Sequence, residues 1–530
     1  MMNNRRIEIL DTTLRDGAQA EGVSFSVNDK FQILESLVSL GIHYIEAGNP
    51  GSNPKDREFY VRYGEKRLEM GASVLAAFGS TRRKGMAVDE DSGIQDLLQS
   101  GAATVVIVGK TWDVEVRDNL RCPLKENLTM IRETVAYLKA QGREVIFDAE
   151  HYFEAARANS EYALNCLQAA DEGGAAVICL CDTNGASIPE EIIQRTQEAI
   201  ACLPDARIGI HCHNDSGLAV ANTIAAVLAG ACHVQGTLNG IGERCGNTNL
   251  ATLIPNLQLK YGIGCIPEDR LYLLTPVARR MAEIANIVLP GGEPYVGASA
   301  FTHKAGMHVD GVKKNPRTFE HVAPESVGNS RRFLLSEISG RSAALDVIRR
   351  IRPDIDKDAP EVGRVLHKLK EMEHQGYHFE GADASQELLV CKELGLYKPF
   401  FNLEKMRISS EQPRTGSFSA YTYIKILVDG VDEVTAAEGE GPVNAMDRAL
   451  KKAMEVFYPE LTQVRLTDFK VRVLNAEATA SQVRTLIEST DGRTVWHTIG
   501  VSTDILEASW LALVDSLEYK LMRKILGWEE

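Results

Sequence analysis

The sequence predicts an α/β protein that begins with a (β/α)₈ TIM barrel, continues through helical linker subdomains and ends in an α+β domain. Two observations predict the barrel. Short apolar runs rich in β-branched residues recur roughly every 30 residues through the first half, with amphipathic stretches between them. Polar side chains of catalytic types gather just after these runs, and barrel enzymes carry their active sites at the C-terminal ends of the strands.

Residues 1–266 form the expected barrel domain. We expect its eight strands at Ile7–Thr12, Tyr44–Ala47, Ser73–Ala77, Thr104–Val108, Glu144–Asp148, Ala176–Cys181, Arg207–His213 and His233–Leu238. The segments between them show the apolar spacing of amphipathic helices, as in Phe31, Leu34 and Leu37 before the turn at Gly41. Eight strands alternating with helices are what a closed parallel barrel requires.

Residues 267–407 are expected to form the helical linker subdomains. Their pattern is mostly helical, but Pro290-Gly291-Gly292 and the polar segment Gly328–Arg332 interrupt it. Between these breaks, Phe301–Gly311 is dense in functional side chains for a connecting segment, and function often concentrates in such segments.

Residues 416–530 are expected to form an α+β domain with an internal pseudo-repeat, in which short strands precede a helix in each half. We expect strands at Tyr421–Val428, Val431–Glu438, Arg465–Val473, Val483–Ser489 and Thr494–Val501, and helices at Val443–Val456 and Asp504–Leu521. Two similar units in one small domain commonly form a dimer interface or a small-ligand site.

The composition is that of an ordinary globular protein, with 44% hydrophobic and 25% charged residues. A net charge of −15 argues against nucleic acid or an anionic membrane as a partner. The longest uncharged stretch, 216–242, is interrupted by polar residues and predicts a buried helix and strand, not a membrane span. The polar start Met1–Arg6 carries no signal peptide pattern, and ten scattered cysteines suit reduced thiols, so we expect a cytoplasmic protein.

A metal site is predicted from three side chains at strand ends. Residues two apart on a strand point to the same side, so His211 and His213 can share one ion while Cys212 turns away. Asp16 follows the first strand and can supply a carboxylate. Two imidazoles and a carboxylate suit a divalent ion such as Zn²⁺, Mn²⁺, Fe²⁺ or Mg²⁺ and leave positions open for substrate oxygens. The His-x-His pattern alone fits a pair of core histidines equally well.

Three motifs, Asp11–Gly17, His211–Gly217 and Gly236–Asn247, resemble the 2-isopropylmalate, homocitrate and citramalate synthase family. The resemblance covers nearly the whole chain, and the C-terminal segment is similar to the family's regulatory dimerisation domain. The run Asp148–Phe153 departs from the Ser-Ala-Glu-Asp-Ala pattern typical of isopropylmalate synthases. With the length of 530 residues, this variant is most similar to the longer citramalate-forming members.

The resemblance implies a Claisen-type condensation of acetyl-CoA with a 2-oxo acid, followed by hydrolysis of the thioester. Pyruvate as the oxo acid would give citramalate, in isoleucine biosynthesis through 2-oxobutanoate. It implies Asp16, His211 and His213 as metal ligands, with Asn247 as a weaker oxygen ligand. The metal would chelate the oxo acid and make its C2 electrophilic.

Further roles follow from the resemblance for four more residues. Arg15 would stabilise negative charge on the reacting oxygens, and Thr183 would bind the oxo-acid carboxylate. Glu150 and His308 would act as an acid and base pair, in which either could take the methyl proton. The post-barrel residue His308 could come from the partner subunit of a dimer, and the spacing to Asp310-Gly311 favours it over His303.

Gln19 and Glu46 are expected either to order the site from behind the reacting groups or simply to pack. Arg15 has an alternative role as a structural partner of Asp16 or Glu46. For the chain as a whole, we expect a homodimer with isoleucine as feedback inhibitor.

Three alternative functions remain at this point. A 2-isopropylmalate synthase would use 2-oxoisovalerate and respond to leucine. A metal-dependent lyase of the hydroxymethylglutaryl-CoA type is suggested by Cys245 in a glycine-rich loop, but such lyases are close to a bare barrel and this chain is about twice as long. A non-catalytic amino-acid sensor is disfavoured because Arg15, Asp16 and the histidines are all present.

Overall fold

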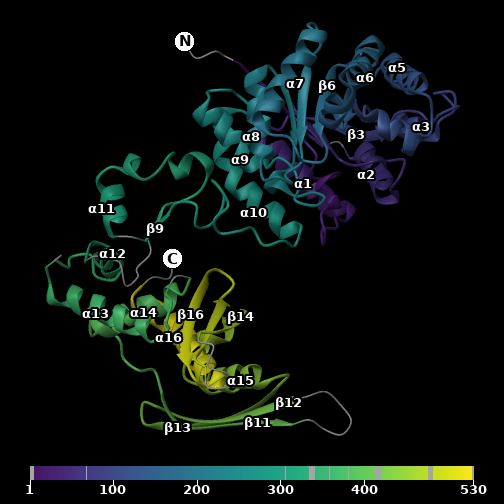
Figure 1. Cartoon of the computed structure of the whole chain (residues 1–530). Coiled ribbons are helices and arrows are strands. Elements are labelled where there is room, and N and C mark those ends of the chain that lie inside the picture. The colour runs from purple at the N-terminus through teal and green to yellow at the C-terminus, as the bar shows by residue number, and fades with distance from the viewer. Residues whose placement is uncertain are drawn as a thin grey trace. The chain divides into compact units, whose positions relative to one another are not determined.

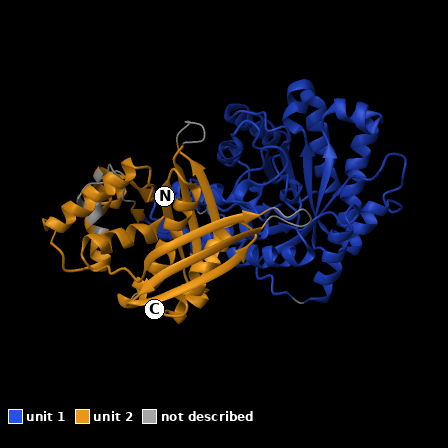
Figure 2. Cartoon of the chain, turned by 90° about the horizontal axis from the view of Figure 1, so that it is seen from below, with its two compact units in different colours: residues 1–301, 321–331 blue, residues 302–320, 332–530 orange. Residues whose placement is uncertain are grey.

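A computed structural model of the chain (Figure 1) describes residues 5–66, 68–304, 306–333, 341–356, 358–379, 381–411, 419–474 and 481–527. Its contacts divide the chain into two compact units, which Figure 2 shows in different colours. The first unit is Met1–Phe301 with His321–Arg331, and the second is Thr302–Glu320 with Arg332–Glu530.

The first unit contains a closed parallel barrel with the strands in the order β1 to β8. The strands are β1 Glu8–Asp11, β2 Tyr44–Glu46, β3 Val74–Ser80, β4 Thr104–Lys110, β5 Glu144–Glu150, β6 Val177–Asp182, β7 Ile208–Cys212 and β8 His233–Gly236. The barrel closes where Ile9 of β1 pairs with Val234 of β8. All eight predicted strands are confirmed, and only their ends differ.

Helices follow the strands and cover the outside of the barrel. They are α1 Val27–Leu40, α2 Pro54–Glu65, α3 Ser92–Gln99, α4 Asp113–Glu115, α5 Leu124–Ala140, α6 Tyr152–Gly173, α7 Pro189–Cys202, α8 Ala219–Ala229, α9 Leu250–Pro255 and α10 Leu274–Ile284. The start of α1 is fixed by a capping box between Ser26 and Asp29, and Gly41 ends it in the left-handed conformation with φ 86°.

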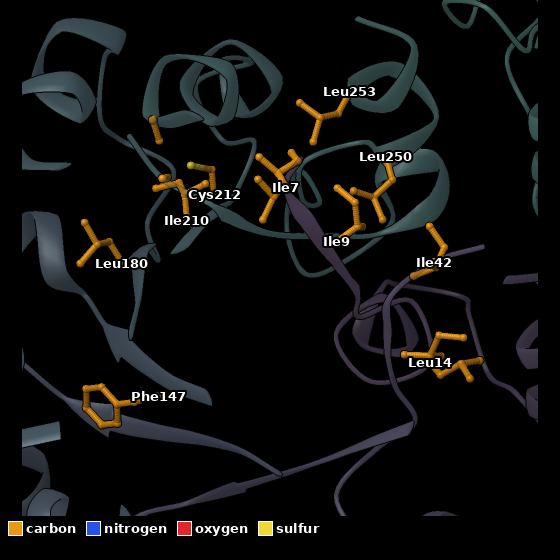
Figure 3. Packing of buried hydrophobic residues seen from close by; sticks show 14 of the residues in the cluster. Ile7, Ile9, Leu14, Ile42, Phe147, Leu180, Ile210, Cys212, Leu250 and Leu253 are labelled. Atoms are coloured by element: carbon orange, nitrogen blue, oxygen red, sulfur yellow. The ribbon is translucent and has the colours of Figure 1, made fainter. Parts of the chain in front are cut away.

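The main hydrophobic core lies between the strands and these helices. Figure 3 shows part of it, with Ile9, Phe147 and Ile210 from the strands and Leu250 and Leu253 from α9. Burial of such side chains stabilises the barrel by roughly 1.5–3 kcal/mol each. This packing holds the strand ends at fixed positions, which the polar residues there depend on.

The barrel interior changes from apolar to polar along the strands. A small apolar cluster that includes Tyr44 of β2 and Ile146 of β5 fills the part nearer the N-terminal ends of the strands. Residues two apart on a strand share a face, so Glu46 and Asp148 occupy the same interior one layer nearer the C-terminal ends. Both are buried. The interior therefore presents a buried polar layer directly below the ends of the strands.

The second unit combines helices with two antiparallel sheets. Its helices are α11 Gly306–Lys314, α12 Arg341–Ile351, α13 Pro360–His374, α14 Asp383–Glu393, α15 Pro442–Met454 and α16 Ile505–Ile525. A short parallel pair joins β9 Thr302–His303 to β10 Arg332–Phe333. One sheet contains β11 Asn402–Glu411, β12 Ser419–Val428 and β13 Val431–Gly439, and the other contains β14 Arg465–Val473, β15 Val483–Thr490 and β16 Val495–Ser502.

The predicted pseudo-repeat is present, because each sheet has three strands with the helix that follows them packed against it, and α14 also contacts β16 of the second sheet. The helix α15 packs against β12 and β13, and α16 packs against β15 and β16. Strand β11 is absent from the sequence prediction, and the expected linker end at residue 407 falls inside it. The expected domain start at residue 416 lies outside the described residues.

No helix in the described part of the chain combines the length and the apolar character that crossing a membrane would need.

A pH dependence of stability follows from Glu518, a buried residue of α16 whose two carboxyl oxygens lie 2.8 and 2.7 Å from Tyr397 Oη, which can share its one hydroxyl proton between them. Burial raises the pKa of Glu518 from 4.5 to about 7. The folded protein therefore keeps a proton that the unfolded chain releases, and stability falls as the pH rises from 4.5 to about 7.

Glutamine cannot ionise, so we expect Glu518→Gln to remove this contribution. The free energy of unfolding should then lose up to about 3 kcal/mol less between pH 4.5 and about 7 than in the wild-type chain. Melting temperatures of the wild-type chain and the variant, measured from pH 4 to pH 8, test it. The two curves should diverge with rising pH, and parallel curves would contradict the prediction.

Candidate active site

A cavity of about 310 Å³ opens at the C-terminal ends of the barrel strands. Its lining consists of Arg15, Asp16, Gln19, Phe78, Val108, Asp148, Glu150, Cys181, Thr183, His211, His213, Glu243 and Arg244. Seven of the ten predicted site residues are among them, although they come from strands far apart in the sequence. Glu46 and Asn247 contact the lining residues from behind.

Three predicted metal ligands converge at the floor of this cavity. Asp16 Oδ2 lies 3.4 Å from His211 Nε2 and 4.0 Å from His213 Nε2. The two Nε2 atoms are 3.4 Å apart. Three donor atoms so close to one another can hold a single ion.

The protonation states of these side chains suit a cation. Burial lowers the pKa of His211, and burial together with His211 lowers the pKa of His213 to about 4. Both imidazoles are therefore neutral at pH 7. Burial opposes the charge of Asp16, but Arg15 and the two histidines outweigh it and lower the pKa of that carboxyl group. One carboxylate and two neutral imidazoles form a good donor set for a divalent ion.

Asn247 offers a fourth donor beside this set. A backbone bridge pairs it with His213, and its Nδ2 donates to the carbonyl of Ile241 at 3.3 Å. Its Oδ1 is buried and accepts no hydrogen bond from the described residues. A buried, unpartnered oxygen is costly unless a ligand satisfies it, and a divalent ion would do so. The residues present therefore fit the metal that the sequence predicts.

Arg15 is held rigidly next to the donor set. Its Nε donates to Glu46 Oε2 at 2.6 Å, its Nη1 lies 3.6 Å from Asp16 Oδ2, and its guanidinium carbon is 3.9 Å from the centre of the Phe78 ring. Burial opposes its charge, but Glu46 and Asp16 outweigh burial and raise the pKa of Arg15. The site thus contains a fixed cation with little freedom to reorganise.

Glu150 is the last residue of β5 and lines the cavity. Lys110, the last residue of β4, is its register partner, and Lys110 Nζ contacts Glu150 Oε2 directly. The same ammonium lies 3.2 Å from Glu115 Oε1. Burial opposes the charge of Lys110, but Glu150 outweighs it and raises the pKa of Lys110. A carboxylate with one oxygen held by an ammonium keeps the other available for a substrate.

Three family models match successive parts of the chain: HMGL-like over residues 6–267, homocitrate synthase post-HMGL domain-like over 295–377, and LeuA allosteric (dimerisation) domain over 380–521. An (R)-citramalate synthase from Aquifex aeolicus (strain VF5) is 49% identical over 98% of this chain and 98% of its own. Another from Sulfolobus acidocaldarius is 43% identical over 99% of this chain and 98% of its own. The chain belongs to the (R)-citramalate synthase family.

A relative of different name, the 2-isopropylmalate synthase of the same Sulfolobus acidocaldarius, is 34% identical over 72% of this chain and 95% of its own. Within one organism, the similarity to the (R)-citramalate synthase is thus higher and extends over more of the chain. Membership in the (R)-citramalate synthase family confirms the resemblance seen in the sequence motifs.

Two more predicted residues, Thr183 and Gln19, line the cavity of this family member, and they differ in how far they are exposed. Thr183 Oγ1 accepts a hydrogen bond from the backbone N–H of His151 at 2.8 Å, so the hydroxyl proton is free for another partner. Gln19 is exposed at the rim, on the short 3₁₀ turn after β1. Glu46, in contrast, is fully buried behind Arg15 and accepts a hydrogen bond from it.

His308 belongs to the second unit, on α11, where it is exposed and stacks on Phe319 with ring centres 4.2 Å apart. Its role beside Glu150 in this (R)-citramalate synthase family member stays a prediction. The competing His303 is buried, with Nε2 3.2 Å from Glu320 Oε1.

Three further residues, Lys110, Asp148 and Gln235, lie at or next to the cavity, and no role was predicted for them from the sequence. Lys110 is the last residue of β4, so the position rule for barrels could have found it, and the same rule marks Asp148, two residues before the end of β5, without giving it a role. Gln235 lies inside the short strand β8, and nothing in the sequence except its polar side chain indicated a role in the site. It is fully buried and hydrogen-bonded to the metal-site histidine of this family member, His211.

Proposed function

We propose that this chain acts as an (R)-citramalate synthase, an acyltransferase that condenses acetyl-CoA with pyruvate and hydrolyses the thioester to give citramalate and CoA. The product would enter isoleucine biosynthesis through 2-oxobutanoate. One observation carries the proposal: a divalent-ion donor set, a fixed cation and a carboxylate share one cavity in a chain whose full-length relatives are (R)-citramalate synthases.

Asp16, His211, His213 and Asn247 would hold the ion. When bound, a divalent ion supplies Lewis acidity toward the oxygens of the oxo acid. The cofactor is proposed as Zn²⁺, Mn²⁺ or Mg²⁺, because the mixed nitrogen and oxygen donors suit each of them.

Arg15 and Thr183 would orient the oxo acid and stabilise the charge that develops. The guanidinium of Arg15 points into the cavity from a position fixed by Glu46 and Phe78, so it needs little reorganisation to stabilise an oxyanion. The free hydroxyl proton of Thr183 would be donated to the substrate carboxylate. Gln19 at the rim and Glu46 behind Arg15 would keep these groups in place.

Glu150 is the proposed base. It would take one proton from the acetyl methyl group, and the resulting enolate carbon would form the new bond to C2 of pyruvate while that carbonyl oxygen gains a proton. Water would then attack the thioester carbonyl, and CoA would leave as the thiol. His308, from this chain or the partner subunit of a dimer, is the proposed acid or water-activating group.

The acetyl-CoA arm would enter beside the donor set. A second cavity of about 230 Å³ shares Arg15, Gln19 and Phe78 with the first, and its lining also includes Lys30 and Lys55. A shared wall suits a two-substrate reaction, since both substrates must approach the same cation.

The C-terminal unit is proposed to regulate the enzyme as a homodimer, with isoleucine as the feedback inhibitor. Support comes from the match of residues 380–521 to the LeuA allosteric (dimerisation) domain. An effector of this kind would report the level of the pathway's end product.

The substrate test is CoA release from acetyl-CoA by the purified chain with each of four oxo acids. We expect pyruvate to exceed 2-oxobutanoate, 2-oxoisovalerate and 2-oxoglutarate by at least 10-fold in kcat/KM, since one methylene in a fitted pocket changes binding by about 1–3 kcal/mol. Preference for 2-oxoisovalerate would favour a 2-isopropylmalate synthase, and release from no oxo acid would overturn the condensation.

The metal test compares His213→Ala with His233→Leu. Removal of a ligand should weaken Mn²⁺ or Zn²⁺ binding by more than about 100-fold, measured by titration calorimetry, and dialysis against a chelator should abolish activity until an ion is restored. His233 is the control because both of its buried ring nitrogens lack hydrogen-bond partners among the described residues. Equal affinities for the two variants would count against the site.

The base test is Glu150→Gln, with Glu115→Gln as its matched control. Both carboxylates contact Lys110, but only Glu150 lines the cavity. We expect kcat for CoA release to fall by about 100- to 10,000-fold in Glu150→Gln, with unchanged metal affinity, because a proton acceptor is lost. A fall of similar size in both variants would mean that the Lys110 cluster, and not the base, limits the rate.

A further inference from the structure

A chain of hydrogen bonds crosses the barrel interior at the cavity, whose lining includes both of its ends, His211 and Asp148. His211 Nδ1 on β7 lies 2.9 Å from Gln235 Oε1 on β8, its register partner. Gln235 Nε2 donates in turn to Asp148 Oδ1 on β5, at 2.7 Å. His211 is 5% exposed, Gln235 0% and Asp148 3%, so water does not compete for these bonds.

The direction of donation along these hydrogen bonds is set at Asp148. Asp148 Oδ1 accepts from the amide N–H of Gln235, which turns Gln235 Oε1 toward His211. A carbonyl oxygen can only accept, so the proton of a neutral His211 belongs on Nδ1. Its Nε2 then carries a lone pair and faces Asp16 and His213.

Asp148 can keep this direction in either protonation state. Burial, assisted by the charge of Glu46, raises the pKa of Asp148 to about 8. When a proton sits on Oδ2, Oδ1 remains an acceptor for the amide of Gln235. The side-chain amide of Gln235 has a donating end and an accepting end. Because its donating end bonds to Asp148, its accepting oxygen faces His211.

We propose that Gln235, held by Asp148, is the positioning residue that fixes His211 as the Nδ1-protonated tautomer and so presents its Nε2 lone pair to a divalent cation. The inference rests on the proposed metal site. It assigns to Gln235 a role that packing alone does not need, since an apolar side chain of similar size would fill the same space without a buried amide to satisfy.

The experiment compares Gln235→Leu and Gln235→Glu with the wild-type chain at pH 7.5, by titration calorimetry with Mn²⁺. Leucine keeps the volume and removes the acceptor, so binding should weaken by roughly 10- to 100-fold. Glutamate keeps an acceptor oxygen for His211 Nδ1, so binding should stay within about threefold of wild type. Unchanged affinity in Gln235→Leu, or equal losses in both variants, would overturn the proposal.

Asn222→Leu is the matched control, because it removes another buried amide, whose Nδ2 donates to the carbonyl of Ser187 at 2.8 Å. This variant should keep wild-type affinity for Mn²⁺ even if it melts earlier. A loss of affinity here equal to that of Gln235→Leu would mean that any buried amide matters, and would overturn the specific role.

A second measurement reads the tautomer without any metal. Nitrogen-15 spectra of the metal-free wild-type chain, labelled at histidine and assigned through His211→Gln, should show His211 protonated on Nδ1. Protonation on Nε2 would overturn the proposal even if Gln235→Leu failed to fold. If the wild-type chain bound no divalent ion while the tautomer was as expected, the proposed metal site would fail and the hydrogen-bond chain would stand.

Discussion

The charge of Arg15 organises the polar end of this barrel. Three carboxylates, Asp16, Glu46 and Asp148, lie almost completely buried in a region where an isolated charge is costly. Arg15 bonds to one of them, lies next to the second and acts on the third through space. The guanidinium is in turn fixed by Glu46 and by the face of Phe78, so neither the cation nor its partners can rearrange independently.

This arrangement leaves the site short of positive charge. Arg15 lies beside both Asp16 and Glu46, so one guanidinium faces two carboxylates. Asp148 adds little charge near neutral pH because burial raises its pKa to about 8, and the two histidines remain neutral because burial lowers the pKa of both. The excess negative charge lies where the donor atoms of Asp16, His211 and His213 converge and where Asn247 Oδ1 lacks a partner. A divalent cation would satisfy the charge and the unpartnered oxygen together, so the electrostatics of the interior and the geometry of its floor favour the same ligand.

The barrel and its polar rim could be predicted from the sequence, because each strand is a short apolar run that ends in a polar residue. Asp16 and the His211–His213 pair follow such runs, and alternation along a strand decides which side chains face inward. The role of Gln235 could not be predicted from the sequence, because its partner Asp148 lies on β5, three strands away in the barrel, and no sequence pattern links the two residues. Strand β11 was missed for a different reason: its residues are mostly exposed and polar, so it lacks the apolar alternation of a half-buried strand.

The choice of oxo acid depends on a small part of this framework. A 2-isopropylmalate synthase shares 34% identity over a length that includes most of the chain, so the scaffold itself does not select pyruvate. The apolar part of the cavity wall includes Phe78 and Val108. Phe78 also supports Arg15, which restricts how far its ring can move without releasing the cation. A change at Phe78 would therefore also alter the support of Arg15. In the proposed reaction, this contact would couple the shape of the oxo-acid pocket to the position of the guanidinium.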